Sequence, residues 1–251
     1  MIRTCLSSEE DFIMKKKTKV ELSLIIGVIL ILVGWLFLRS QIYQPSLEAK
    51  KAAEQTTVMR NNLVFQAKLS KAPMVIFYPG ALVEPKSYSI WAKKLSAAGY
   101  PVYIVRFPMD LAVLAPNKAN EVRNKNDRDY VIGGHSLGGV MASRYAQKHQ
   151  KNLKGVFFLA SYPDKKGSLK KISIPVLSIT ASRDGVLNKK AYKKAKQWLP
   201  TRTTFEVIKG GNHAGFGSYG KQKGDRKATI STAEQQQEIA RYLINWLKNI
   251  K

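Results

Sequence analysis

Short apolar runs alternate with amphipathic stretches along most of the chain, from about residue 57 onward. Five of the six runs carry several β-branched or aromatic residues without polar alternation, which is typical of strands buried on both faces. The six runs are 74–78, 102–107, 130–133, 155–160, 175–180 and 205–208. This pattern predicts a mostly parallel sheet covered by helices, with "NNLVFQA" near residue 64 as an added edge strand.

The amphipathic stretches between the runs predict helices on both faces of the sheet. They are 85–98, 117–125, 137–150 and 189–199, followed by a C-terminal helix. That last helix has the clearest start, because Ser231 and Glu234 form a capping box. Behind it, Ile239 and Leu243 recur on one helical face. Residues 57–251 therefore read as one α/β domain.

A different pattern precedes this domain. Residues 22–38, "LSLIIGVILILVGWLFL", form an uncharged run of 17 residues, which as a helix would be about 25 Å long. Four lysines precede it, which favours a cytoplasmic segment 1–21 and an extracellular C-terminal domain. We expect a single-pass anchor in the cell membrane, followed by a polar tether over 39–56. A cleaved signal peptide is the alternative, although "RSQIYQPS" offers no convincing cleavage site.

Charge and cysteine content narrow the classes of function. Lys and Arg total 42 against 17 Asp and Glu, a net charge of +25, which favours anionic surroundings such as lipid headgroups or envelope polymers. The lysines are spread along the chain and no nucleic-acid-binding signature appears, so we expect no nucleic-acid partner. A lysine-rich surface that serves solubility alone is the alternative. The single cysteine, Cys5, excludes an internal disulfide and a cysteine nucleophile in the main domain. It lies in a leader before "MKKKTK", which resembles a natural start at Met14.

The stretch "VIGGHSLGGV" contains the G-x-S-x-G pattern, with Ser136 at its centre. It falls directly after a predicted strand and before a predicted helix, and a sharp turn there would lift the hydroxyl clear of the sheet. The helix N-terminus supplies free N–H groups for developing negative charge. We therefore predict that Ser136 is a nucleophile, with a purely structural turn as the alternative. No Lys-Ser or Lys-Thr follows the last glycine, which excludes a phosphate loop.

A serine nucleophile needs a base, and the chain has three histidines. His213, in the glycine-rich stretch "KGGNHAGFG" after the last predicted strand, is the candidate. The side chain of His135 should point elsewhere, and His149 should lie near a helix C-terminus. Asp184 in "SRDG" is the predicted acid that orients the base, because its strand should neighbour the one that leads to His213. Asp164 in "SYPD" is the alternative acid.

The tetrahedral intermediate of acyl transfer needs two N–H donors. The amide of Leu137, the residue after the nucleophile, is the first candidate. The loop "FYPGALVEP" after the first main strand should supply the second, and we predict the amide of Ala81, with Gly80 allowing a close approach. A plain tight turn is the alternative interpretation of that loop.

Together these motifs resemble the α/β-hydrolase superfamily, in particular the α/β hydrolase fold-5 branch related to dienelactone hydrolases. The resemblance rests on "FYPGALVEPKSY", "GGHSLGG", "SRDG" and "GGNHAGFGSYG". It implies an α/β-hydrolase fold and a hydrolytic triad of Ser136, Asp184 and His213 that acts without cofactor or metal. Serine in place of the cysteine of dienelactone hydrolases argues against that particular activity. Only about 14 residues separate Ala160 from Pro175, where many relatives insert a lid, so a minimal lid or none is expected.

These features predict a membrane-anchored serine hydrolase that cleaves a carboxylic ester, or a similar acyl bond, through an acyl-serine intermediate. The expected partners are a small-molecule or envelope-linked acyl substrate, the membrane and anionic envelope polymers. Two alternatives remain open. One is acyl transfer to an envelope polymer by the same triad, and the other is a catalytically silent basic binding module on the same fold.

Overall fold

The computed structural model describes residues 3–54, 56–70, 73–123 and 128–250, with side chains in the first helix described from residue 19 onward. The side chain of Cys5 and the predicted helix end at residue 125 lie outside this described part. The chain divides into two units, residues 1–42 and 43–251.

The N-terminal unit is one long helix, α1 (Arg3–Ser40). Its portion Lys19–Ser40 has a mean hydropathy of 2.6 and is long and apolar enough to cross a membrane. The predicted span 22–38 lies within this portion. A helix that is apolar on all sides suits a bilayer better than a soluble domain, although a signal sequence has the same composition.

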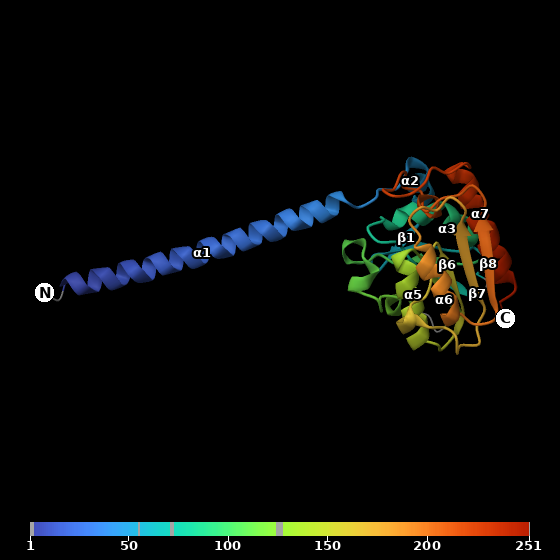
Figure 1. The fold of residues 1–251 in the computed structure, drawn as a ribbon, viewed down its shortest axis with the longest axis horizontal. Coiled ribbons are helices and arrows are strands. Elements are labelled where there is room, and N and C mark those ends of the chain that lie inside the picture. Colours follow the sequence, from blue (N-terminus) through green and yellow to red (C-terminus); the bar gives the residue numbers. More distant parts are fainter. Residues whose placement is uncertain (1–2, 55, 71–72, 124–127, 251) are drawn as a thin grey trace. The chain divides into compact units, whose positions relative to one another are not determined.

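An eight-stranded sheet forms the centre of the second unit (Figure 1). The strands are β1 (Thr57–Met59), β2 (Asn62–Phe65), β3 (Met74–Tyr78), β4 (Val102–Ile104), β5 (Tyr130–His135), β6 (Leu153–Leu159), β7 (Val176–Ala181) and β8 (Thr203–Ile208). Their order is β1-β2-β4-β3-β5-β6-β7-β8, and the six strands from β4 to β8 in this order are parallel. All six predicted strands are confirmed. The expected edge strand, β2, instead lies between β1 and β4, because a tight turn at Arg60 and Asn61 folds β1 against it.

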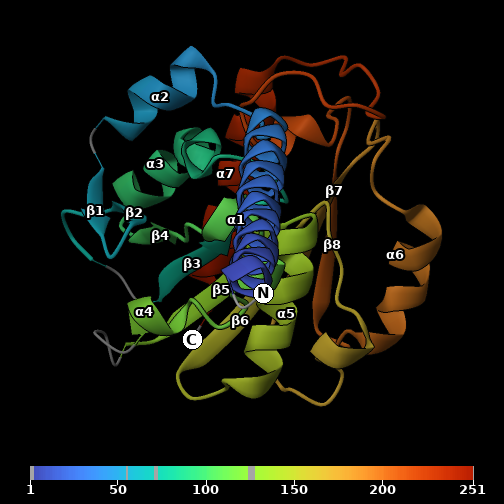
Figure 2. The same ribbon diagram turned by 90° about the vertical axis from the view of Figure 1, so that its left-hand side faces the viewer.

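Helices cover both faces of the sheet, as predicted (Figure 2). They are α2 (Leu47–Ala53), α3 (Ser89–Ala97), α4 (Asn120–Arg123), α5 (Leu137–Lys148), α6 (Lys189–Ala195) and α7 (Thr232–Lys248). Along β3 the side chains alternate: Val75 and Phe77 pack with α3 and α7, whereas Ile76 and Tyr78 pack with α5. The predicted capping box of α7 is present, with Ser231 and Glu234 bonded reciprocally. Between β6 and β7 the chain makes only one short 3-10 turn, η4 (Lys165–Gly167), so no lid domain lies there.

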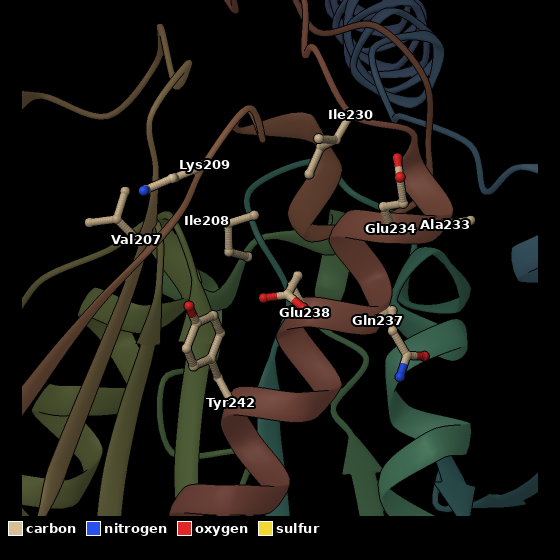
Figure 3. Close-up of a pocket in the computed structure, with 9 residues that line it drawn as sticks. All are labelled: Val207, Ile208, Lys209, Ile230, Ala233, Glu234, Gln237, Glu238 and Tyr242. Carbon is tan, nitrogen blue, oxygen red and sulfur yellow. The ribbon is translucent and has the colours of Figure 1, made fainter.

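The outer strand β8 leaves one edge of the sheet open. Phe205 and Val207 are 42% and 51% exposed. Beside Val207 a hollow of about 610 Å³ lies between β8 and α7, with Tyr242 reaching into it from the helix (Figure 3).

Residues 43–54 belong to the second unit, which corrects the predicted tether over 39–56. The Tyr43 amide donates to the Leu82 carbonyl at 2.7 Å, and the Glu84 amide donates to the Tyr43 carbonyl at 3.1 Å. Farther along, the Ser46 amide donates to the Ser218 carbonyl at 2.7 Å. Backbone hydrogen bonds, the single ring of Tyr43 against Tyr219, and alanine side chains make these contacts, so no apolar periodicity marked the segment as part of the fold.

Two truncations test this boundary. Deleting residues 1–42 should leave the domain folded, because the buried residues of the described chain lie in the second unit. Deleting residues 1–56 also removes α2, with its buried Ala49 and Ala53, and the Tyr43–Tyr219 ring contact. We expect this longer deletion to lower the melting temperature by roughly 5–10 °C relative to the shorter one, from a loss of ~2–3 kcal/mol. Equal melting temperatures in thermal denaturation would contradict the corrected boundary.

Candidate active site

Ser136 lies at the turn between β5 and α5, as predicted. Its backbone has φ 51° and ψ −125°, a conformation that residues other than glycine rarely adopt. Two hydrogen bonds hold the turn: the Ser136 amide donates to the Leu159 carbonyl at 3.1 Å, and the Ser161 hydroxyl donates to the Ser136 carbonyl at 2.6 Å. Such a strained strand-to-helix turn has the form of a nucleophile elbow. Ser161 was not singled out from the sequence, since nothing there separates it from an ordinary loop serine.

The glycines around Ser136 are required by backbone packing. A Cβ atom on Gly138 would lie 2.2 Å from the carbonyl oxygens of both Tyr78 and Pro79. One on Gly134 would lie 2.5 Å from the carbonyl carbon of Gly138. No side chain fits at these distances, because α5 begins directly against the ends of β3 and β5. The spacing of the G-x-S-x-G pattern therefore follows from the geometry of the elbow.

Asp184 and His213 form a buried hydrogen-bonded pair. His213 Nδ1 lies 2.8 Å from Asp184 Oδ2, and each side chain is 1% exposed. The other carboxylate oxygen accepts the amides of Val186 at 2.9 Å and Leu187 at 2.8 Å. Burial alone would raise the pKa of Asp184, but the hydrogen bond and charge of His213 together with these amides outweigh it and lower the pKa. Asp184 is therefore ionised at neutral pH and accepts the Nδ1 proton of His213.

The strands explain how these two residues meet. Asp184 follows β7 and His213 follows β8, and the two strands pair in parallel along their length. The prediction of Asp184 from the sequence assumed that these two strands are neighbours in the sheet, as they are. The alternative acid, Asp164, is bonded instead to Arg144 of α5 and to the Gly167 amide, so it is not the partner of His213. His149 is the C-cap residue of α5, as expected, at the helix end remote from Ser136.

The second ring nitrogen of His213, Nε2, is buried and has no hydrogen-bond partner within the described residues. A buried polar atom without a partner is costly and calls for an explanation. A base that must take a proton from a hydroxyl needs such a free nitrogen. No hydrogen bond joins it to Ser136 Oγ in the described chain, and in free enzymes such bonds are often long and tighten only with substrate.

Comparison with known proteins identifies the family. The model of the alpha/beta hydrolase family matches residues 74–238. The chain belongs to the α/β-hydrolase family. No curated protein sequence matches it significantly.

Several solved structures share the fold of this α/β hydrolase. A predicted CIB-like hydrolase from Thermoplasma acidophilum has 18% identity and a TM-score of 0.56 over 78% of this chain and 97% of its own. Est1E from Butyrivibrio proteoclasticus has 13% identity and a TM-score of 0.56 over 78% and 99%. A ferulic acid esterase from Streptomyces cinnamoneus has 18% identity and a TM-score of 0.59 over 73% and 68%. At these identities the likeness establishes the fold.

His135 occupies a position in this α/β hydrolase that the sequence did not indicate. Its ring centroid lies 4.5 Å from that of His213, and its Nδ1 lies 2.9 Å from the hydroxyl of Tyr88. That hydroxyl accepts the Gly80 amide at 2.9 Å. Burial, and then the neighbouring His213, hold the pKa of His135 well below its ordinary value. Nδ1 of a neutral His135 therefore accepts a hydrogen bond from the Tyr88 hydroxyl, and His135 links the candidate base to the loop after β3.

The loop after β3 leaves one amide free. The Gly80 amide donates to the Tyr88 hydroxyl, and the Leu82 amide donates to the Asp110 carbonyl at 2.9 Å. Between them, the Ala81 amide has no protein acceptor in the described residues. Leu137 is the first residue of α5, where the N–H has no intrahelical acceptor. The two amides named from the sequence are thus available, and their role as oxyanion donors stays a prediction.

Asp110 borders the same loop in an unusual environment. Both Asp110 and the preceding Met109 have positive φ, at 52° and 53°. Burial raises the pKa of Asp110 to about 6, with Arg106 opposing the rise and Glu84 adding to it. Because the folded-state pKa lies above the ordinary value of 3.8, the folded protein binds this proton more tightly than the unfolded chain does. The resulting stabilisation is complete below pH 3.8 and is lost as the pH rises through about 6.

Asp110→Asn should therefore stabilise this hydrolase at neutral pH. Asparagine tolerates the left-handed backbone and removes the charge. Since Asp110 is partly exposed, we expect a gain of only ~1 kcal/mol, or roughly 2–4 °C in melting temperature at pH 7.5. The difference should nearly vanish at pH 4. Thermal melts of both proteins across this range test the prediction, and a lower melting temperature of the variant at pH 7.5 would contradict it.

Proposed function

We propose that this protein is a serine hydrolase that cleaves a carboxylic ester, or a similar acyl bond, through an acyl-serine intermediate. The observation that carries the proposal is the buried Asp184–His213 pair, whose base has a free Nε2, on strands that end at the same sheet edge as the Ser136 elbow. Belonging to the α/β-hydrolase family supports the same reaction class.

In the proposed mechanism, Ser136 Oγ attacks the carbonyl carbon of the substrate while His213 Nε2 takes the hydroxyl proton. Asp184 holds the imidazole in the required tautomer and stabilises the imidazolium that forms. The amides of Leu137 and Ala81 donate to the oxyanion of the tetrahedral intermediate. His213 then protonates the leaving alcohol as the carbon–oxygen bond breaks. Attack by water, deprotonated by His213, releases the acid and restores Ser136.

The substrate is proposed to be small or attached to a surface. The absence of a lid domain between β6 and β7 supports an open site, because a long acyl chain needs a more enclosed pocket. One of the structurally similar proteins, the ferulic acid esterase, supports an ester over other acyl bonds.

We further propose that Lys19–Ser40 anchors the enzyme in the cell membrane, with the catalytic unit outside. The hydropathy of this segment and the lysines before it support this orientation. The excess of basic residues would hold the domain near anionic lipid headgroups or envelope polymers.

Activity-based labelling tests the catalytic proposal. A fluorophosphonate probe should label Ser136, and Ser136→Ala should abolish labelling and lower kcat/KM on a short-chain nitrophenyl ester by about 10⁴-fold. Asp184→Asn should cost about 10³–10⁴-fold because the imidazole loses its preferred tautomer. Ser70→Ala, an exposed serine before β3 at the far end of the sheet, serves as the matched control. Hydrolysis that survives in Ser136→Ala would overturn the proposal.

Protease accessibility tests the topology. In intact cells an added protease should digest the domain that begins at Tyr43, whereas the segment before Lys19 should be protected until the cells are lysed. The reverse pattern of protection would contradict the proposed orientation, and release of the domain in soluble form would indicate a cleaved signal peptide.

A further inference from the structure

Asp225 lies between the His213 loop and α7, outside the predicted site, and its carboxylate accepts three backbone amides. Oδ1 accepts from Gly185 at 3.0 Å and from Arg226 at 2.9 Å, and Oδ2 accepts from Ala214 at 2.9 Å. Gly185 directly follows Asp184, and Ala214 directly follows His213. A single carboxylate therefore bridges the residue after the candidate acid and the residue after the candidate base.

The next residue, Arg226, is also hydrogen-bonded to both of these loops. Its guanidinium donates to three consecutive carbonyls, those of Ser182 at 3.1 Å, Arg183 at 3.2 Å and Asp184 at 2.9 Å. Its own carbonyl accepts the side-chain amide of Asn212 at 2.9 Å, next to His213 in the chain. The pair Asp225–Arg226 thus contacts both loops through charged groups.

The bridging segment fits closely against the acid loop. A Cβ on Gly185 would lie 2.6 Å from the Gly224 carbonyl oxygen and 3.0 Å from the Arg226 amide nitrogen. Gly224 itself has a φ of +83°, which lets the chain turn at this point. The backbone of the segment and the backbone after Asp184 are therefore in direct contact, so a shift of one displaces the other.

We propose that Asp225 is a positioning residue that fixes Asp184 and His213 relative to each other. This inference rests on the proposed function, because it assigns catalytic roles to those two residues. The pair stands on two loops at the ends of β7 and β8, just beyond the last backbone bond between them, from the Arg183 amide to the Gly211 carbonyl at 2.9 Å. An ionised carboxylate only accepts, so both of its oxygens can hold the amides that follow the pair, and charge-assisted bonds of this kind are stronger than neutral ones.

The main test is Asp225→Asn in the full-length protein. Asparagine keeps the size but replaces one acceptor oxygen with an NH₂ group, which cannot accept from the Gly185 or Ala214 amide. We expect kcat on a short-chain nitrophenyl ester to fall by about 10–100-fold while KM changes less than about threefold, because the pair is displaced and substrate binding is not. Asp129→Asn, which changes a surface carboxylate near Lys154 before β5, is the matched control and should leave kcat unchanged.

A double-mutant cycle separates positioning from general loss of structure. If Asp225 acts through the Asp184–His213 pair, Asp225→Asn should have little further effect in the Asp184→Asn background. An unchanged kcat in the single variant, or the same fold-loss in both backgrounds, would overturn the inference. Should Asp225→Asn fail to fold, the cycle is carried out with Asp225→Glu, which keeps two acceptor oxygens on a longer arm and is read by the same criterion.

A spectroscopic measurement distinguishes failure of this inference from failure of the proposed function. The His213 Nδ1 proton bonded to Asp184 should give a downfield NMR resonance in the wild type, which shifts or disappears in Asp225→Asn and stays in place in Asp129→Asn. This result would support positioning whether or not the protein hydrolyses esters. A resonance unchanged in Asp225→Asn would overturn it. Activity that persists in Ser136→Ala would overturn the proposed function alone.

Discussion

A carboxylate that is removed from water must have its oxygens hydrogen-bonded or it becomes protonated, and this constraint on Asp184 shapes the whole site. Its two oxygens together accept two amides of its own loop and one imidazole proton. These hydrogen bonds and the charge of His213 outweigh the effect of burial on the pKa of Asp184, so the carboxylate stays ionised. An ionised Asp184 fixes the tautomer of His213 and leaves Nε2 as its free nitrogen. The electrostatic state of one side chain thus determines where a proton can be accepted.

The hydrogen bonds to the Asp184 carboxylate require two segments that are far apart in the chain to lie side by side. The parallel pairing of β7 and β8 brings the acid and base loops to one edge, and a backbone bond from the Arg183 amide to the Gly211 carbonyl extends the pairing into these loops. Beyond that point, hydrogen bonds of Asp225 and Arg226, in the segment before α7, connect the two loops. On its other side, the His213 ring lies against the ring of His135. His135 is hydrogen-bonded to Tyr88, and the Tyr88 hydroxyl accepts the Gly80 amide, in the loop that holds the candidate oxyanion amide. The candidate site is therefore held from two directions by groups outside the proposed triad.

The sequence predicted those features that follow from local rules. Apolar runs located six strands, the capping box located α7, and the G-x-S-x-G pattern located the turn at Ser136. Features made by single long-range hydrogen bonds had no such signal. Tyr88 looks like any residue of a short helix, Ser161 like any loop serine, and Asp225 like a polar turn residue. Residues 43–54 were read as a tether for the same reason, since their contacts use backbone groups, alanine and one isolated tyrosine ring.

Backbone strain marks the same edge of the sheet independently of any motif. Each of the four neighbouring strands β4, β3, β5 and β6 is followed by a non-glycine residue with positive φ. These residues are Met109 and Asp110, Leu82, Ser136 and Ala160. Such conformations cost on the order of 1–3 kcal/mol each and persist only where the surrounding structure imposes them. The strands beneath them are buried on both faces, so the core supplies the stability that offsets this strain. At the opposite edge of these four strands, Asn152 before β6 is the one described non-glycine residue with a positive φ. The strain is therefore concentrated at the edge that carries Ser136, and it marks that edge without reference to which side chains react.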